Sequence, residues 1–263
     1  MIPEHLSYLL HQPQSGDDKY SRGVVGFVTG SDRYPGAAIL GVTAAMRTGV
    51  GMVRHVAAAT VTNLLLEVRP EVVAGFGRAQ AWMLGSGVPV DDEVQVANIL
   101  EAASQTCPLV IDAGALEVVD YSSLAPQTCI LTPHAGELAR LLDRFGKHFD
   151  LDYEAVVAAA AITDQVVMLK GNTTLIADPH GEVRAVGPNS TALATAGTGD
   201  VLAGILGALL ATNADGETDL LDIAELAVHI HSEAAMRAAE AGPVVALDVA
   251  EQVRTVIRDW MPA

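Results

Sequence analysis

Short runs of Val, Ile and Leu recur along the chain, and each is followed by a turn residue and a longer stretch rich in Ala and Leu. The runs are almost continuously apolar rather than alternating between apolar and polar positions. Such runs are typical of parallel strands that helices cover on both faces. The predicted strands span residues 23–29, 51–56, 71–74, 81–84, 109–112, 129–131 and 165–170. The pattern therefore predicts an α/β fold with a mostly parallel central sheet.

The longer Ala- and Leu-rich stretches predict the helices that cover this sheet. They span residues 36–48, 60–67, 91–104, 133–145, 151–163, 198–211, 220–241 and 248–259. Thr60 and Asp91 suit N-cap positions, and Pro133 suits a first helical position because its missing N–H would have no helical partner there. Residues 173–186 differ, since a D-P-H-G turn separates two extended runs, and they predict a β-hairpin.

The organisation of the chain predicts one domain over residues 1–263, with residues 1–18 as an arm or short helix that could pack against a second subunit. No break rich in Pro, Gly or Ser and no internal repeat divides the 263 residues. The longest apolar stretches, such as residues 201–211, fall short of the roughly 20 residues that span a bilayer. The N-terminus also lacks the pattern of a secretory signal. A cytoplasmic protein with no membrane span is expected.

The chain is acidic, with a formal net charge of −17 at pH 7. Long-range repulsion therefore opposes attachment to nucleic acid or to an anionic membrane, and an anionic ligand needs a locally electropositive pocket. Cys107 and Cys129 cannot form a disulfide framework and lack zinc-ligand spacing, so they are interpreted as small apolar core residues. His229 and His231 lie two apart on a predicted helix and point to different faces, which argues against a metal pair.

The most informative segment is A-T-A-G-T-G-D-V-L-A-G at residues 194–204, in which a glycine-rich loop runs directly into an apolar helix. Unpaired backbone N–H groups converge at the positive end of such a helix and make an anion site. Asp200 places a carboxylate where the anion should bind, and the two negative charges repel each other. Such a carboxylate is expected only if it has a chemical role, such as accepting a proton from an attacking hydroxyl. The alternative is that Asp200 only charges the first helical turn. The segment is neither a dinucleotide fingerprint nor a P-loop.

This segment resembles the anion-hole and catalytic-aspartate motif of the ribokinase-like superfamily. Four further segments resemble the ADP-dependent NAD(P)H-hydrate dehydratases in the same order: Y-P-G-A-A-I-L at 34–40, L-G-S-G-V at 84–88, L-T-P-H-A-G-E-L at 131–138 and V-V-M-L-K-G-N-T-T at 166–174. The match covers roughly residues 19–211, and its specificity lies in the combination of motifs. The resemblance implies a three-layer ribokinase-like fold, with helices on both faces of the sheet.

The resemblance also implies roles for individual residues. The hydrated nicotinamide nucleotide would contact Ala37, Gly87, His134 and Asp200, and Asp200 would be the catalytic base. The adenine nucleotide would contact Lys170, Gly171, Asn172, Thr173, Thr174 and Gly199. The anion hole would consist of the amides of Gly197, Thr198 and Gly199. Gly87 lies in G-S-G-V where the family usually has G-P-G followed by Leu and Gly, so Ser86 and Val88 depart from the family pattern.

Two acidic residues outside the glycine-rich segment are further candidates. Glu137 corresponds to the glutamate that orders magnesium-bound water in the superfamily, although His134 replaces the usual asparagine; the alternative is a helix N-terminal acid favoured by the dipole. His134 and Glu137 share a helix face through their i, i+3 spacing. Asp112 ends a strand, where open parallel sheets bind ligands, and turn capping is an equal alternative.

The resemblance implies an enzyme that uses ADP, with Mg²⁺, to dehydrate the S epimer of hydrated NADH or NADPH, releasing NAD(P)H, AMP and phosphate. It also implies a homotetramer. An epimerase domain is often fused ahead of the family's dehydratase, and at 263 residues this chain has no room for one, so a separate epimerase is the expected partner. The alternatives are an ATP-dependent kinase of a hydroxymethylpyrimidine or hydroxyethylthiazole vitamin precursor, against which T-P-H in place of T-P-N argues, and a non-catalytic nucleotide-binding sensor.

Overall fold

A central sheet runs through the computed structural model, which describes residues 2–125, 128–150, 153–214, 216 and 218–261. Within these residues the sheet has nine strands in the order β3-β2-β1-β4-β5-β6-β7-β8-β9. The strands are β1 (Val24–Val28), β2 (Met52–His55), β3 (Val73–Ala74), β4 (Ala81–Leu84), β5 (Leu109–Ile111), β6 (Cys129–Leu131), β7 (Val166–Leu169), β8 (Thr174–Ala177) and β9 (Val183–Val186). Strands β1 to β7 pair in parallel, and the predicted hairpin β8–β9 adds two antiparallel strands at one edge.

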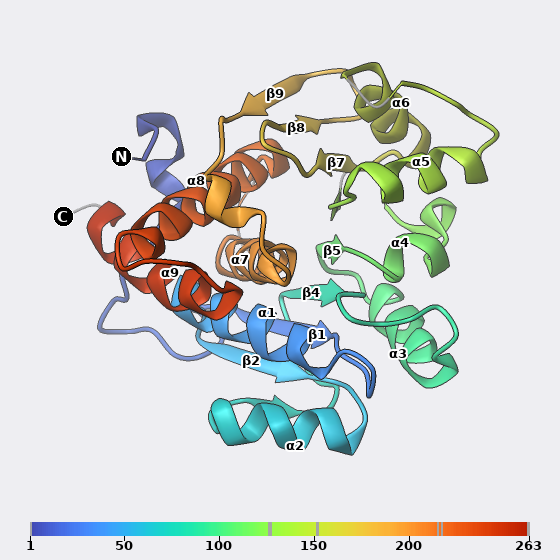
Figure 1. The fold of residues 1–263 in the computed structure, drawn as a ribbon. Coiled ribbons are helices and arrows are strands. Elements are labelled where there is room, and N and C mark those ends of the chain that lie inside the picture. Colours follow the sequence, from blue (N-terminus) through green and yellow to red (C-terminus); the bar gives the residue numbers. More distant parts are fainter. Residues whose placement is uncertain (1, 126–127, 151–152, 215, 217, 262–263) are drawn as a thin grey trace.

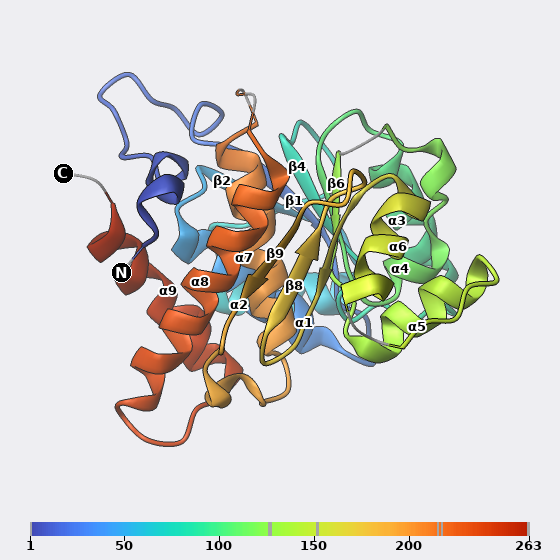
Figure 2. The ribbon, with the colours of Figure 1, turned by 90° about the horizontal axis from the view of Figure 1, so that it is seen from above.

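Helices cover both faces of the sheet and complete three layers (Figures 1 and 2). One layer contains α1 (Pro35–Thr48), α7 (Thr198–Thr212), α8 (Leu220–Ala239) and α9 (Ala246–Trp260). The opposite layer contains α3 (Glu93–Ala103), α4 (Ala115–Val118), α5 (Ala135–Arg144) and α6 (Tyr153–Thr163). Helix α2 (Ala59–Val68) lies beside β2 at the edge of the sheet opposite the hairpin (Figure 1). The predicted α/β architecture is confirmed.

Side chains that alternate along each strand fill two separate cores. On β4, Met83 faces the core under α1 and α7, whereas Trp82 and Leu84 face the core under α3 to α6. Because both faces are buried, the strands read as continuous apolar runs in the sequence. In the described residues, no helix combines the length and the hydropathy that crossing a bilayer requires.

Two glycines let α1 and α7 approach each other at backbone distance. A Cβ atom on Gly204 would lie 2.1 Å from the carbonyl oxygen of Gly41, so no larger residue fits without a backbone shift. A Cβ on Gly41 would in turn lie 3.3 Å from the carbonyl oxygen of Asp200. This crossing holds the first turn of α7 over the centre of the sheet.

Several predicted helix starts are wrong. Helix α9 begins at Ala246 rather than at residue 248, and α1 begins one residue before its predicted start, at Pro35. Helix α2 begins at Ala59 with Ala58 as N-cap, and the hydroxyl of Thr60 donates to Asp32 instead of capping the helix. In the pair Asp91-Asp92 the cap is Asp92, which accepts a hydrogen bond from the N–H of Gln95 at 3.1 Å. Local sequence could not choose between these two carboxylates.

Pro133 also lies outside its predicted helix, because α5 begins at Ala135 with His134 as N-cap. The start predicted at residue 151 lies outside the described residues, and α6 is described from Tyr153. Short elements that the pattern did not predict are α4 and the 3₁₀ helices η2 (Tyr121–Ser123) and η3 (Thr191–Leu193).

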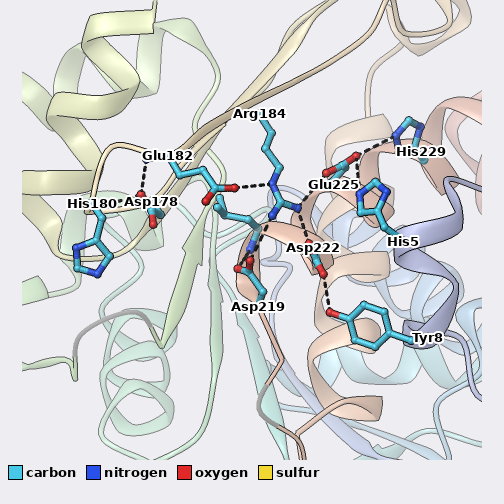
Figure 3. A network of polar contacts seen from close by, with 11 residues as sticks. His5, Tyr8, Asp178, His180, Glu182, Arg184, Asp219, Asp222, Glu225 and His229 are labelled. Atoms are coloured by element: carbon cyan, nitrogen blue, oxygen red, sulfur yellow. Dashed lines mark hydrogen bonds and ion pairs between the residues drawn. The ribbon is translucent and has the colours of Figure 1, made fainter.

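The first residues of the chain form a 3₁₀ helix, η1 (Glu4–Leu9), that packs on α8 (Figure 1). Leu6 and Leu9 are fully buried in the core beneath α8 and α9. Figure 3 shows the polar contacts that accompany this packing: the Tyr8 hydroxyl donates to Asp222 at 2.6 Å, and Asp222 also accepts from Arg184 of β9. The predicted short helix is therefore present and packs against its own chain.

Candidate active site

The candidate site lies where parallel strands β1, β4, β5, β6 and β7 end, the edge at which open α/β sheets bind ligands. The loops after β4 and β5 are joined at backbone distance. A Cβ on Gly85, whose φ is +103°, would lie 2.1 Å from the carbonyl oxygen of Asp112, and one on Gly114 would lie 2.0 Å from that of Val88. These two glycines hold the Ser86 loop directly against the loop that carries Asp112.

Asp112 is the centre of a buried polar network. Its carboxylate accepts hydrogen bonds from Ser86 Oγ at 2.6 Å and Thr132 Oγ1 at 2.9 Å, and forms an ion pair with Lys170 Nζ at 2.7 Å. Burial alone would raise the pKa of Asp112, but Lys170 and the two hydroxyls outweigh it and lower the pKa. Asp112 is therefore an anion at neutral pH, and its ion pair with Lys170 was part of neither interpretation from the sequence.

Lys170 supplies the positive charge at this strand edge. Its ammonium group also lies 3.9 Å from Glu137, and its backbone N–H donates to Pro133 O at 2.9 Å. Burial opposes its charge, but the carboxylates of Asp112, Glu137 and Asp200 outweigh burial and raise the pKa of Lys170. Lys170 is therefore a cation at neutral pH, and it offsets part of the negative charge of the three carboxylates around it.

Asp200 lies in the first turn of α7, which reaches over this network. Its pKa is raised to about 6, first by burial and then by the negative charge of Asp112, while Lys170 and a hydrogen bond from Ser86 act in the opposite direction. A carboxylate with a pKa near neutrality accepts a proton more readily than a solvated one. Burial and the charge of Asp112 therefore set this carboxylate apart from an exposed acid in a first helical turn.

The start of α7 has the features of an anion site. Gly197 is the N-cap with φ +90°, and a Cβ there would lie 2.6 Å from Leu40 Cδ1. A Cβ on Gly199 would point toward Lys170 Nζ at 3.8 Å, so the ammonium and the helix start face the same space. Thr198 contributes differently, because its N–H makes a long 3.4 Å bond to Thr195 O and its hydroxyl donates to Leu193 O and Thr195 O.

His134 and Glu137 form a capping box at the start of α5. The Nδ1 atom of His134 accepts from the N–H of Gly136 at 3.0 Å, while Glu137 Oε2 accepts from the N–H of His134 at 2.8 Å. His134 Nε2 lies 3.4 Å from Glu137 Oε1. The side chain of His134 is 56% exposed, which leaves the ring accessible to a ligand.

The residues present fit a magnesium ion that enters with a nucleotide rather than a resident one. Among the described residues no group of three His, Cys, Asp or Glu side chains is placed to hold a metal. Mg²⁺ is commonly bound through one carboxylate, water and substrate phosphates, and Glu137 beside Lys170 offers one carboxylate near the anion site. Both oxygens of Glu137 are engaged with His134, so an interaction through water fits better than direct ligation.

Ala37 of α1 and Gly87 of the loop after β4 lie against each other. A Cβ on Gly87, whose φ is +68°, would lie 2.5 Å from the Cβ of Ala37. The Ser86 carbonyl accepts from the N–H of Gly30 at 2.8 Å, which ties this loop to the end of β1. The structure thus brings together these two predicted substrate-binding residues.

The turn 170–174 is held by a residue that the sequence did not single out. Asn189 donates from Nδ2 to Gly171 O at 3.0 Å and to Thr174 Oγ1 at 3.1 Å, and its N–H donates to Asn172 O at 2.7 Å. Gly171, Asn172 and Thr173 remain exposed. Residues 187–189 lie outside the motifs singled out in the sequence, and nothing in their spacing links them to Lys170.

His231 is a second residue whose place could not be read from the sequence. It is buried on α8, and burial lowers its pKa to about 4. The ring is therefore neutral at pH 7, and its Nε2 atom has no hydrogen-bond partner among the described residues. His229 faces Glu225 instead, so the two histidines point apart as predicted.

Comparison with known proteins decides the family. The profile of the NAD(P)H-hydrate dehydratase family matches residues 25–256. The chain belongs to this family. The dehydratase resemblance of the sequence motifs is thereby confirmed, and the match extends beyond residue 211 through α8 and most of α9.

Curated relatives of this dehydratase family carry one or two activities. A bifunctional NAD(P)H-hydrate repair enzyme from Corynebacterium glutamicum is 39% identical over 229 residues, covering 80% of this chain. The chain spans only 39% of that relative's length. An ADP-dependent (S)-NAD(P)H-hydrate dehydratase from Bacillus subtilis is 32% identical over 248 residues, which are 88% of this chain and 87% of that relative.

Solved structures agree with this assignment. An ADP/ATP-dependent NAD(P)H-hydrate dehydratase from Bacillus subtilis, co-crystallised with ATP and Mg²⁺, superposes with a TM-score of 0.80 at 27% identity, covering 98% of this chain and 96% of that one. A ribokinase-like superfamily protein from Enterococcus faecalis, 22% identical, superposes with a TM-score of 0.83 over 98% of this chain and 94% of its own. The predicted ribokinase-like fold is confirmed.

Proposed function

We propose that this protein dehydrates the S epimer of hydrated NADH and NADPH with ADP, releasing NAD(P)H, AMP and phosphate. The observation that carries the proposal is the placement of Asp200, with a pKa raised to about 6, on the first turn of α7 beside the Lys170 ammonium. A base and a cation that share one anion site serve phosphoryl transfer to an alcohol. The family assignment supplies the substrate class.

The chemistry addresses a poor leaving group. Hydration of the nicotinamide ring leaves a hydroxyl at C6, and hydroxide leaves slowly. Asp200 accepts the proton of this hydroxyl while the hydroxyl oxygen attacks the β-phosphorus of ADP. The bond between that phosphorus and the AMP oxygen breaks. The C6–O bond of the phosphorylated ring then breaks, driven by the ring nitrogen lone pair. Loss of a C5 proton restores the C5=C6 double bond, and phosphate departs.

The surrounding residues bind and orient the reactants. The amides of Gly197 to Gly199 and the Lys170 ammonium are assigned to the transferring phosphoryl group, because they face one space. Gly171 to Thr174 are assigned to the adenine nucleotide on the exposed turn that Asn189 holds. Ala37, Gly87 and His134 are assigned to the hydrated nicotinamide nucleotide. A Mg²⁺ ion that arrives with the nucleotide would neutralise phosphate charge, with Glu137 holding one of its waters.

The wider setting of the enzyme is part of the same proposal. Because the reaction consumes one epimer, an epimerase activity is proposed to supply it, and the bifunctional name of the Corynebacterium glutamicum relative supports this pairing. A homo-oligomer, with the tetramer as the expected form, and a cytoplasmic location are proposed with it.

Incubation with hydrated NADH and ADP tests the function. Nicotinamide absorbance should return in step with the appearance of AMP. Asp200→Asn should lower kcat by about 10²- to 10⁴-fold, because a positioned general base contributes that much. A vitamin-precursor kinase would instead consume ATP and its pyrimidine or thiazole substrate without restoring nicotinamide absorbance, and a sensor would bind nucleotide without turnover.

A matched control distinguishes a base from a helix-terminal charge. Asp248 occupies the first turn of α9, as Asp200 occupies that of α7, but its carboxylate is exposed and accepts from the N–H of Val245 at 3.0 Å. Asp248→Asn should retain the turnover of the unmodified enzyme. Equal losses in the two variants, or full turnover by Asp200→Asn, would contradict the proposed role.

A further inference from the structure

A buried asparagine holds the turn that follows β7. Asn189 lies in the segment between β9 and η3, and only 9% of the residue is exposed. Its Nδ2 group donates to Gly171 O at 3.0 Å and to Thr174 Oγ1 at 3.1 Å. A side-chain amide has two donor hydrogens, and both are used here. The side chain of Asn189 therefore has no donor left for a ligand.

The backbone of the same segment completes the contact. The N–H of Asn189 donates to Asn172 O at 2.7 Å, and Asn172 Nδ2 donates to Asn189 O at 3.4 Å. Gly187 brings the two chain segments to backbone distance, because a Cβ there would lie 2.9 Å from both Asn172 O and Thr173 Cα. A larger residue at this position would push the turn away. The position of the turn is thus set by residues 187–189.

These contacts leave the turn with unpaired backbone donors. Asn189 occupies the carbonyl oxygens of Gly171 and Asn172. In the part of the chain that the structure describes, the N–H groups of residues 171–173 donate to no other group, and all three residues are exposed. Lys170, which directly precedes them, adds a charged donor. The turn therefore offers hydrogen-bond donors to a ligand rich in acceptor atoms, such as the ring nitrogens and phosphate oxygens of a nucleotide.

We propose that Asn189 is a positioning residue of the nucleotide site: it occupies the carbonyl oxygens of the turn, so that the N–H groups of residues 171–173 remain for the adenine nucleotide. This inference rests on the proposed function, which assigns the turn to ADP. Asn189 acts through the turn and not by touching the nucleotide, because its donors are engaged with the protein. Its effect is on the binding of ADP rather than on the proton transfer at Asp200.

The segment that carries Asn189 also leads to the phosphoryl end of the site. The N–H of Ser190 donates to Ser232 Oγ of α8 at 2.9 Å. The chain then forms η3, whose last residue, Leu193, accepts a hydrogen bond from Thr198 Oγ1 at the start of α7 at 2.8 Å. The segment thereby holds both parts of the nucleotide site in place before a ligand arrives, and preorganisation of this kind favours affinity.

The test compares Asn189→Ala with Asn213→Ala. Asn213 is a matched control, because it is also a buried asparagine whose Nδ2 donates to two backbone carbonyls, but it lies at the opposite end of α7 from the anion site. Both substitutions remove a buried amide and should lower stability. Only Asn189→Ala should raise the dissociation constant of ADP, by about tenfold in calorimetry, because a turn that is ordered a tenth of the time binds that much more weakly.

Turnover measurements separate positioning from chemistry. Asn189→Ala should raise the KM for ADP by about tenfold and leave kcat at saturating ADP within about threefold of its original value, because the anion site and Asp200 are unchanged. Asn213→Ala should leave both constants close to those of the unmodified enzyme. A fall in kcat with an unchanged KM, or equal changes in the two variants, would overturn the proposal.

Two further variants keep the inference testable if alanine at residue 189 prevents folding. Asn189→Leu has a similarly branched, uncharged side chain without donor hydrogens, so it should weaken ADP binding as alanine does. Gly187→Ala leaves the amide of Asn189 in place but displaces the turn through its Cβ, so it should weaken ADP binding in the same direction. Unchanged affinity in both variants overturns the inference.

Nucleotide binding also distinguishes a failure of this inference from a failure of the proposed function. Calorimetry with ADP or AMP needs no hydrated NADH, so a tenfold loss in Asn189→Ala supports the positioning role even if another alcohol is the phosphoryl acceptor. Equal affinity of Asn189→Ala and the unmodified protein for both nucleotides overturns the positioning role even if NADH is restored as proposed. Failure of the unmodified protein to bind either nucleotide overturns both.

Discussion

At the scale of single residues, the site combines the Asp112–Lys170 ion pair with a third charged group, Asp200, whose pKa is raised. Asp112 and Lys170 neutralise each other at 2.7 Å, whereas Asp200 is left with a carboxylate neighbour and little solvent. The sequence separation of 58 residues between Asp112 and Lys170 hides this pairing, because only the order of strands β5, β6 and β7 brings their ends together. A base with a raised pKa carries a stability penalty that can be measured.

Asp200→Asn should stabilise the folded protein at pH 8. The folded pKa of Asp200, about 6, lies above the ordinary value of 3.8, so the ionised carboxylate is disfavoured by folding above pH 6. This penalty fades as the pH falls from 6 toward 4, because the group then protonates in the folded state. The variant should gain about 1–3 kcal/mol in unfolding free energy at pH 8 and little at pH 4.5. Urea unfolding at both pH values checks this, and a gain of equal size at each would exclude a protonation effect.

At the scale of elements, the crossing of α1 and α7 positions the catalytic turn. The Ala- and Leu-rich stretches predicted both helices, yet they gave no sign of which glycines meet. Gly41 and Gly204 are glycines because the two helices touch there, and this contact is visible only in the folded structure. Helix starts failed for a related reason, since Asp91 and Asp92 are both competent caps and the fold chooses between them.

Gly204→Ala should destabilise the protein by about 3 kcal/mol, because its Cβ would collide with the backbone of Gly41. Gly36→Ala is a matched change in α1, where a Cβ meets open space among the described residues. It should raise stability by about 0.5–1 kcal/mol through helix propensity. Thermal and urea unfolding measure the stability of the two variants against that of the unmodified protein. A Gly204→Ala variant as stable as the original would show that the helices can separate without penalty.

At the scale of the whole molecule, Arg184 connects the hairpin edge of the sheet, α8 and the first residues of the chain (Figure 3). Its guanidinium contacts Glu182 at 3.1 Å, Asp219 at 3.3 Å, Asp222 and Glu225. His5 of η1 lies 3.5 Å from Glu225 on the far side of that carboxylate. A single cation thus offsets several carboxylates in an acidic protein.

Arg184→Met should lower the unfolding free energy by about 2 kcal/mol, because Asp222 and Glu225 would lose the cation that compensates their partly buried charges. Arg33→Met is the control, since Arg33 and Asp91 form an ion pair between exposed side chains and should contribute little. The difference between the variants should shrink in 1 M salt, which screens charge. Chemical unfolding at low and high salt measures both effects.

The sequence predicted the layers, the parallel strands and the hairpin because a strand buried on both faces has a simple apolar signature. It singled out Asp200 and Lys170 because their motifs are local. Asn189 and Ser86 act through contacts between loops that are distant in sequence, and no periodicity records such contacts. The roles assigned to individual site residues remain predictions for the experiments above.

The burial of Leu6 and Leu9 has a practical consequence for anyone trimming this protein. The family profile begins at residue 25, so boundaries drawn from homology would discard the whole of η1. Such a truncation would leave a cavity beneath α8 where Leu6 and Leu9 pack, and would remove the Tyr8 hydroxyl that donates to Asp222. Shortened versions should therefore keep their first ten residues.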